Sequence, residues 1–176
     1  MLVHSLIMSR IDYCNSLFSG CSADTIADLQ STLNAAARMV SSTGRYNNVK
    51  PILKDLHWLP VEQRIPFKIA VTTYRCLTGG SLPYLKEMIA PTASNNRRSG
   101  LRSAERGYLI APLSRTKRLS QHSFRHSAPP VWNALPEALR LSHSMESSTL
   151  FKFCKALKTH LFSLSYLLCD RNASAT

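Results

Sequence analysis

Apolar residues recur at steps of three and four through the first ninety residues, which is the spacing of amphipathic helices. One stripe, from Leu2 to Phe18, predicts a first helix. A second stripe, from Ile26 to Val40, predicts another helix that is capped by Ser22 or Asp24 and closed by Gly44. The short link between the two stripes predicts an antiparallel helical hairpin.

The stretch LKDLHWLPVEQRIPFKI, residues 53–69, joins two apolar segments through a Trp-Leu-Pro corner. Leucines three residues apart predict a short helix that ends against Trp58. We expect Pro60 to stop this helix, because proline lacks an amide donor and disfavours helical geometry in the residue before it. The next helix, about residues 61–77, begins at once. Pro66 lies inside it and predicts a kink.

A basic, polar segment follows a further short helix at residues 82–89. Core-forming residues almost vanish over residues 92–107, which predicts a linker or mobile loop. Residues 91–126 hold eight Lys and Arg against one acid, so +7 of the chain's net charge of +12 lies there. Residues 108–111, YLIA, predict a short strand that pairs with residues 115–119.

A second aromatic and proline corner, PPVWNALPEAL, occupies part of residues 124–139. We expect Trp132 to be buried there against Leu135 and Phe124. A last amphipathic helix is predicted from about residue 147 to 168, with lysines on its polar face.

The expected fold class is therefore mainly α. Residues 1–90 should form a helical bundle and residues 91–107 a basic flexible linker. Residues 108–170 should form a small C-terminal unit with a candidate β-ribbon, closed by the long last helix. The tail, residues 171–176, should fray.

The excess of basic over acidic residues indicates which kinds of partner the protein can attract. Twenty-two Lys and Arg against ten Asp and Glu raise association with polyanions, either nucleic acid or an anionic membrane surface. The alternative is a basic protein without a polyanion partner, since net charge governs association and solubility and not fold.

The cysteines and the first residues indicate an intracellular protein of the cytoplasm or nucleus. Five widely spaced cysteines without a CxxC pair argue against a disulfide framework and against a zinc knuckle. His4, Arg10 and Asp12 interrupt the N-terminal apolar segment, so no signal peptide or membrane span is predicted.

No pattern of catalytic residues emerges from the sequence, and no cofactor is expected. GxSxG, HExxH and a phosphate-binding glycine loop are all missing. His122 and His126 are four residues apart, but no third metal ligand accompanies them. Two-metal nucleotidyl transfer needs clustered carboxylates, whereas the ten acids are scattered and no Asp-Asp pair occurs. We therefore expect this chain alone not to be an enzyme.

The basic segment is the first candidate site. Arginines along a flexible loop can reach successive phosphates, and each neutralised phosphate releases counterions. Tyr108 and Phe124 at its edges are candidates for stacking on bases. The alternative is a solvated linker whose charge prevents aggregation. The candidate residues are Arg97, Arg98, Arg102, Arg106, Arg115, Lys117 and Arg118.

Six stretches, in register from about Ser9 to Phe162, resemble the C-terminal region of reverse transcriptases from non-LTR (LINE-type) retrotransposons. They are SRIDYCNSLFSG, LQSTLNAAARMV, LKDLHWLPVEQRIPFKI, LPYL, SFRHSAPPVWNALPEALR and LFKFCKALKTHLF. The resemblance implies thumb helices and a C-terminal extension. It also implies that the catalytic carboxylates lie upstream, in a Tyr-x-Asp-Asp motif that this sequence lacks. The resemblance further implies that Met1 lies inside the thumb, as expected for a reading frame predicted from a truncated element.

The thumb of such enzymes grips the template–primer duplex, which would place Arg38, Arg45 and Lys50 near a nucleic-acid backbone. The implied partner is RNA or an RNA–DNA duplex, bound through phosphates, with an upstream palm as a second partner and no membrane. Two alternatives stay open. One is a helical interaction module that docks the palm, and the other is a non-functional remnant.

Overall fold

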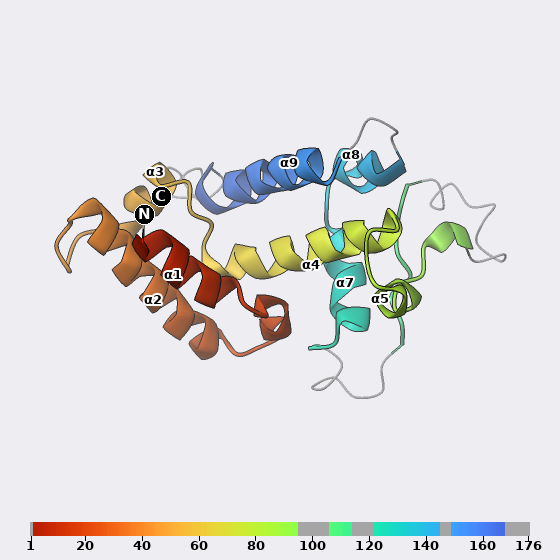
Figure 1. Ribbon diagram of the computed structural model, residues 1–176, viewed down its shortest axis with the longest axis horizontal. Helices are drawn as coiled ribbons and strands as arrows, with labels where there is room; N and C mark the ends of the chain where they lie inside the picture. Colours follow the sequence, from red (N-terminus) through yellow and green to blue (C-terminus); the bar gives the residue numbers. More distant parts are fainter. Residues whose placement is uncertain (1, 95–105, 114–121, 145–148, 168–176) are drawn as a thin grey trace, which may run out of the picture. The chain divides into compact units, whose positions relative to one another are not determined.

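The computed structural model describes residues 2–94, 106–113, 122–144 and 149–167, and these residues are predominantly helical (Figure 1). The expectation of a mainly α fold is confirmed. Among the described residues, β pairing is limited to one isolated antiparallel bridge, between Pro91 and Leu109. None of the described helices is both long and apolar enough to cross a membrane.

The chain forms two compact units. The first combines Met1–Ile65 with Lys158–Thr176, and the second is Pro66–Leu157. This division differs from the predicted boundaries at residues 90 and 107, because composition marks where polar residues gather whereas contacts mark which segments pack together. Helices α4 (Val61–Leu77) and α9 (Leu150–Phe162) each contribute to both units.

The first unit contains the predicted hairpin. Helices α1 (Leu2–Asp12) and α2 (Ala23–Ser41) lie side by side in Figure 1 and pack together. Ser22 caps α2, as predicted, by accepting a hydrogen bond from the Thr25 amide. Helix α1 is shorter than predicted, since it is followed by Cys14, which is left-handed (φ 52°), and by a 3-10 turn at Asn15–Phe18.

Two predicted helix ends in this unit are wrong. Helix α2 ends at Ser42, which takes the left-handed conformation (φ 51°), and not at Gly44. Helix α3 (Val49–Asp55) ends before Pro60, because His57 is left-handed (φ 55°) and the Trp58 amide bonds back to the Leu53 carbonyl at 2.9 Å. This bond belongs to the Schellman ending, which a sequence normally signals with glycine.

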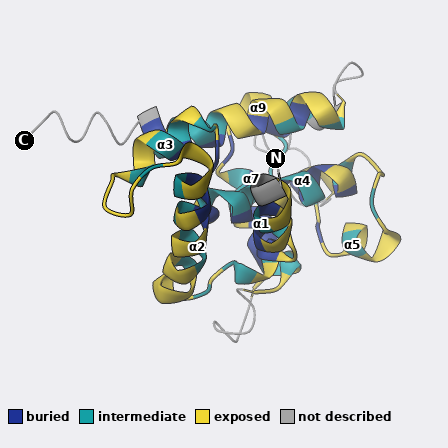
Figure 2. Ribbon diagram, turned by 60° about the vertical axis from the view of Figure 1, so that its left-hand side comes forward, coloured by how far each residue is buried: buried dark blue, intermediate teal, exposed yellow. Residues whose placement is uncertain are grey.

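The core of the first unit surrounds Trp58, whose side chain is 5% exposed. Tyr166, from the π-helical turn Ser163–Leu167 that follows α9, donates its hydroxyl to the Trp58 carbonyl at 2.7 Å. Figure 2 shows the buried residues of α2 along one side of the helix and exposed residues along the other. The core side chains are Met8, Ile11, Leu33, Ala36, Ala37, Leu53, Trp58, Val61 and Tyr166.

The second unit is built on α4, which continues through Pro66 and stops before the left-handed Gly79 (φ 79°). The predicted kink at Pro66 stays a prediction. Helices α5 (Pro83–Glu87), α7 (Phe124–Asn133) and α8 (Glu137–Arg140) complete the unit together with α9.

The core of the second unit is aromatic. Trp132 is fully buried, as predicted, and its ring lies 5.9 Å from that of Phe153 between centroids. Phe153 in turn stacks on Tyr74 at 4.3 Å. These contacts were not expected from the sequence, because Phe153 lies 21 residues after Trp132 and 79 residues after Tyr74 along the chain.

The predicted strand at residues 108–111 has a different partner from the expected one. The Ile110 amide donates to the Ala90 carbonyl at 2.8 Å, and the Thr92 amide donates to the Tyr108 carbonyl at 2.9 Å. The segment therefore pairs with residues 90–92. The expected partner, residues 115–119, lies outside the described residues.

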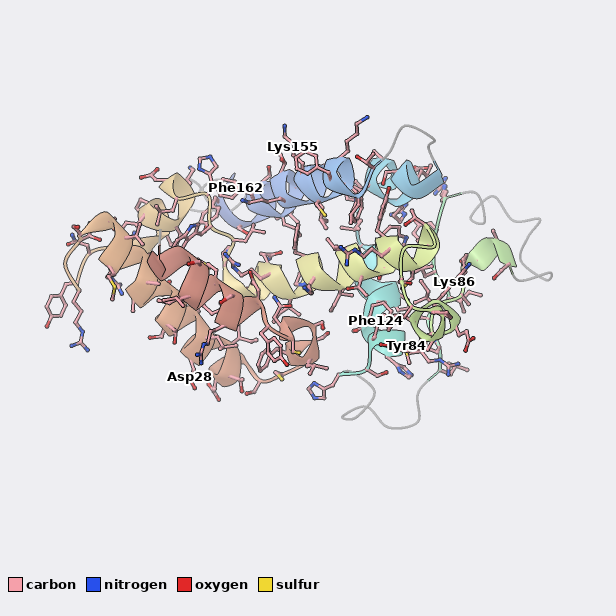
Figure 3. The ribbon with its side chains drawn as sticks, viewed as in Figure 1. Asp28, Tyr84, Lys86, Phe124, Lys155 and Phe162 are labelled. Carbon is pink, nitrogen blue, oxygen red and sulfur yellow. The ribbon has the colours of Figure 1, made fainter. Side chains whose placement is uncertain are left out.

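Helix α9 begins at Leu150, two or three residues after its predicted start. The Thr149 hydroxyl accepts a hydrogen bond from the Lys152 amide at 3.4 Å and so caps the helix. The polar face is exposed as predicted, and Lys155 projects away from the helix (Figure 3).

Candidate nucleic-acid interface

The ten basic residues named from the sequence are divided by the fold. Arg38, Arg45 and Lys50 belong to the first unit, and Arg106 belongs to the second. The first three gather where α2 meets α3. The remaining six lie outside the described residues and stay predictions: Arg97, Arg98, Arg102, Arg115, Lys117 and Arg118.

Residues 38–50 form what we call the α2–α3 corner. It contains three cations and no acid. Arg45 and Lys50 are exposed, the former in the connecting loop and the latter in the first turn of α3. An acid-free, exposed surface of this kind attracts anions, since no carboxylate in this part of the chain offsets the field of the cations.

Hydrogen bonds hold the loop of the corner in shape. The Asn47 amide donates to the Gly44 carbonyl at 3.2 Å, which closes a turn. The Asn48 side chain caps α3 by accepting from the Lys50 amide at 3.1 Å. Arg38 Nη2 donates to the Asn47 carbonyl at 3.4 Å, which ties the last turn of α2 to the loop.

Arg38 thus differs from the other two cations of the corner. Its side chain is half-buried, and Nη2 of its guanidinium is hydrogen-bonded to the loop. Its Nε is buried without a hydrogen-bond partner among the described residues. We interpret Arg38 as a residue that positions the loop, while Arg45 and Lys50 present charge to solvent.

Tyr46 is the residue of this corner that sequence reasoning missed. Its side chain is 97% exposed, the largest value of any aromatic residue that the structure describes. It follows Arg45 directly in the loop between α2 and α3. A sequence signal was available, because Tyr46 lies between turn-forming residues and outside both helical stripes, so no core position calls for it.

Arg106 lies in a different environment, at the start of a segment that we call the strap, residues 106–110. The Arg106 side chain is exposed, but its carbonyl accepts a hydrogen bond from Arg140 Nε at 3.1 Å. Trp132 Nε1 donates to the Gly107 carbonyl at 2.9 Å. The strap is therefore held by side chains of α7 and α8.

Asn133 and Arg140 make further hydrogen bonds around the strap. The Asn133 amide group both accepts from the Leu109 amide and donates to the Leu109 carbonyl, each at 2.9 Å. Arg140 is only 5% exposed, and its guanidinium also donates to the carbonyls of Asn133 and Leu135. The stretch VWNALPEALR thus has a structural role.

Tyr108, one of the predicted base-stacking residues, contacts Arg140. The Arg140 guanidinium lies over the Tyr108 ring, 4.1 Å from its centroid. One face of the ring is thus covered by a cation–π contact. Phe124, the other predicted stacking residue, begins α7 and is half-buried.

The first unit contains a comparable structural arginine. Arg64 Nη1 donates to both carboxylate oxygens of Asp12 at 2.9 Å, and its Nε donates to the Leu59 carbonyl at 2.9 Å. The Asn15 amide reaches the Arg64 carbonyl at 3.4 Å. The stretches around Asp12 and Arg64, both part of the resemblance, are thereby joined across 52 residues.

Metal ligands and cysteines are the remaining reactive groups of the described residues. No three His, Cys, Asp or Glu side chains of the described part lie close enough together to hold a metal ion. Burial raises the pKa of the Cys154 thiol, although Arg75 acts in the opposite direction, so this cysteine is a poor nucleophile. Cys76 is buried in the core and Cys14 is exposed.

Comparison of the chain with protein-family models, with curated proteins and with solved structures finds no significant match. The resemblance to LINE-type reverse transcriptases therefore rests on the six stretches of sequence alone.

Proposed function

We propose that this chain is a nucleic-acid-binding, non-catalytic part of a LINE-type reverse transcriptase, corresponding to its thumb and the region that follows. It binds RNA or an RNA–DNA duplex through phosphates, and bond-making belongs to an upstream palm. The observation that carries the proposal is the α2–α3 corner, where Arg45 and Lys50 are exposed and no acid accompanies them. The resemblance supports it independently.

A salt titration tests the proposal. Binding through phosphates releases counterions, so the affinity for an RNA–DNA duplex should fall steeply as salt rises and should depend little on sequence. The double variant Arg45→Ala, Lys50→Ala should weaken binding and lower the salt slope by about 2, one for each phosphate contact removed.

The matched control is the double variant Lys68→Ala, Lys86→Ala, which removes the same charge from two exposed positions of the second unit. It should leave the salt slope near that of the unaltered chain. A flat salt dependence of the unaltered chain would contradict the proposal. Equal losses in both double variants would show that net charge, and not the corner, is responsible.

The second candidate function is a helical module that docks an upstream palm. It is favoured by exposed apolar side chains on and just after α1: Leu6 is 63% exposed, Tyr13 77% and Leu17 60%. Exposed apolar side chains of this size are typical of interaction surfaces when they are contiguous. Size-exclusion chromatography with and without a supplied palm domain tests this function, since docking predicts co-elution at low and high salt alike.

A further inference from the structure

We infer that the α2–α3 corner receives an unpaired base on Tyr46, so that it prefers single-stranded RNA or DNA over a blunt duplex. Arg45 and Lys50 would hold the phosphates on either side of that base. This inference rests on the proposed function and refines it, because phosphate binding alone does not distinguish paired from unpaired strands.

The exposure of Tyr46 is the first support. Burial of an aromatic ring is favourable, yet the ring of Tyr46 is 97% exposed on a loop that its own hydrogen bonds hold in place. Three other described aromatic residues are strongly exposed, namely Tyr13, Tyr84 and Phe151. Of the exposed tyrosines, only Tyr46 lies in an acid-free stretch, because Tyr13 follows Asp12 and Glu87 comes three residues after Tyr84.

The chemistry of the corner is the second support. A cationic surface with an exposed aromatic ring is the combination by which proteins bind single strands, where the cations track the backbone and the ring stacks on a base. In a duplex the faces of the bases are covered by their neighbours. A ring exposed on a loop therefore finds a stacking partner at every unpaired base of a single strand, but in a duplex only at the two end pairs.

The hydrogen bonds of the loop are the third support. Arg38 ties α2 to the Asn47 carbonyl, directly after Tyr46, and Asn48 caps the helix that follows. The backbone on the C-terminal side of Tyr46 is thereby restrained before any ligand arrives. Preorganisation of this kind lowers the entropic cost of binding, so one stacked ring can produce a measurable preference.

The test compares two forms of one oligonucleotide, a 12-nucleotide single strand and its blunt RNA–DNA hybrid, by fluorescence anisotropy. We expect Tyr46→Ala to weaken single-strand binding about tenfold or more, because one stacked base is lost. Binding of the hybrid should change less than about twofold. Tyr46→Phe keeps the ring and should bind as the unaltered chain does.

Phe151→Ala is the matched control, since Phe151 is 78% exposed and lies beside the exposed Lys152, but on the regular helix α9. It should leave both affinities unchanged. A loss in Phe151→Ala that Tyr46→Ala does not show would overturn the assignment. Equal losses on both substrates in Tyr46→Ala would also overturn it, while leaving phosphate binding by Arg45 and Lys50 intact.

A second measurement is independent of affinity. Trp58 and Trp132 are 5% and 0% exposed, so a Tyr46→Trp variant adds the only strongly exposed indole of the described residues. Its fluorescence should be quenched by the single strand and not by the hybrid. Salt-dependent binding without this quenching would overturn the inference alone, whereas absence of salt-dependent binding would overturn the proposed function with it.

Discussion

The α2–α3 corner of the first unit and the strap of the second unit both carry arginine, but they use it in opposite ways. At the corner, Arg45 is exposed on a loop without acids. Against the strap, Arg140 is buried and donates to the carbonyls of Arg106, Asn133 and Leu135. A count of arginines therefore does not locate an anion-binding surface.

The physical reason lies in the guanidinium group. It presents five donors in one plane and stays charged at any ordinary pH. Where several main-chain carbonyls converge, as they do around Arg140, these donors are satisfied inside the protein. At Arg45, for which the described part of the chain shows no such acceptor, the side chain is exposed and its charge is available to a ligand.

Replacement of Arg140 should give the largest effect. Arg140→Ala removes the hydrogen bonds to three main-chain carbonyls and the contact with the Tyr108 ring. The free energy of unfolding should therefore fall by about 3 kcal/mol. Urea denaturation measures this change.

The control for that experiment is Arg45→Ala, which should alter the free energy of unfolding by less than about 0.5 kcal/mol because the side chain is exposed. Arg140→Lys should recover only part of the stability, since an ammonium group does not reproduce the planar fork. Similar losses for Arg45→Ala and Arg140→Ala would contradict the contrast between the two regions.

A pair of glycine substitutions gives the next effect. Gly107 in the strap has φ 68°, and an added Cβ would lie 3.3 Å from Leu141 Cδ2 and 3.4 Å from the Arg140 carbonyl oxygen. Gly107→Ala should therefore cost about 2 kcal/mol. At the corner, Gly44 has open space around a Cβ. Gly44→Ala should be neutral or slightly stabilising, because it restricts the unfolded chain.

Thermal unfolding of both alanine variants separates the two positions. A drop in melting temperature for Gly107→Ala alone would support the close packing of the strap. A Gly107→Ala variant as stable as the unaltered chain would show that the strap does not approach α8 as the structure describes.

The smallest effect concerns Tyr166 in the core of the unit that carries the corner. Burial raises the pKa of its hydroxyl to about 12, while Arg64 acts in the opposite direction. Between about pH 10 and pH 12 the unfolded chain loses this proton and the folded chain keeps it, so folding stability falls as the pH rises through that range.

Tyr166→Phe removes both the titration and the hydrogen bond to the Trp58 carbonyl. Near pH 8 the variant should be less stable by about 1 kcal/mol. The difference from the unaltered chain should shrink as the pH rises from about 10 to about 12. Denaturation at several pH values measures it, and a difference that is constant with pH would count against a buried, protonated Tyr166.

Local signals in the chain anticipated local structure. Ser22 was one of two residues expected to cap α2 and does so, and α4 spans Val61–Leu77 as predicted. The helix ends were predicted wrongly where a residue adopts a backbone conformation that is unusual for its type. Ser42 and His57 are left-handed without being glycine, so the ends of α2 and α3 were misplaced. Such positions are held by hydrogen bonds to the preceding turn, which no single residue type announces.

The candidate site was anticipated only in part. Arg45 and Lys50 were named and are exposed, whereas Tyr46 was overlooked, because the role that we infer for it rests on its exposure in the folded loop. Tyr108 was named for stacking, but Arg140 covers one face of its ring. A helical pattern indicates which side of a helix is apolar, and it says nothing of which distant side chain will approach a given ring.

Residue types and spacings of a few residues were enough to predict the mainly α character and the positions of the long helices. The acid-free, basic composition of the corner is likewise visible along the chain. The pairing of Arg64 with Asp12, the burial of Arg140 and the pairing of the strap with residues 90–92 became visible only in the fold. These outcomes depend on segments that are far apart along the chain, and only packing of the whole core brings such segments together.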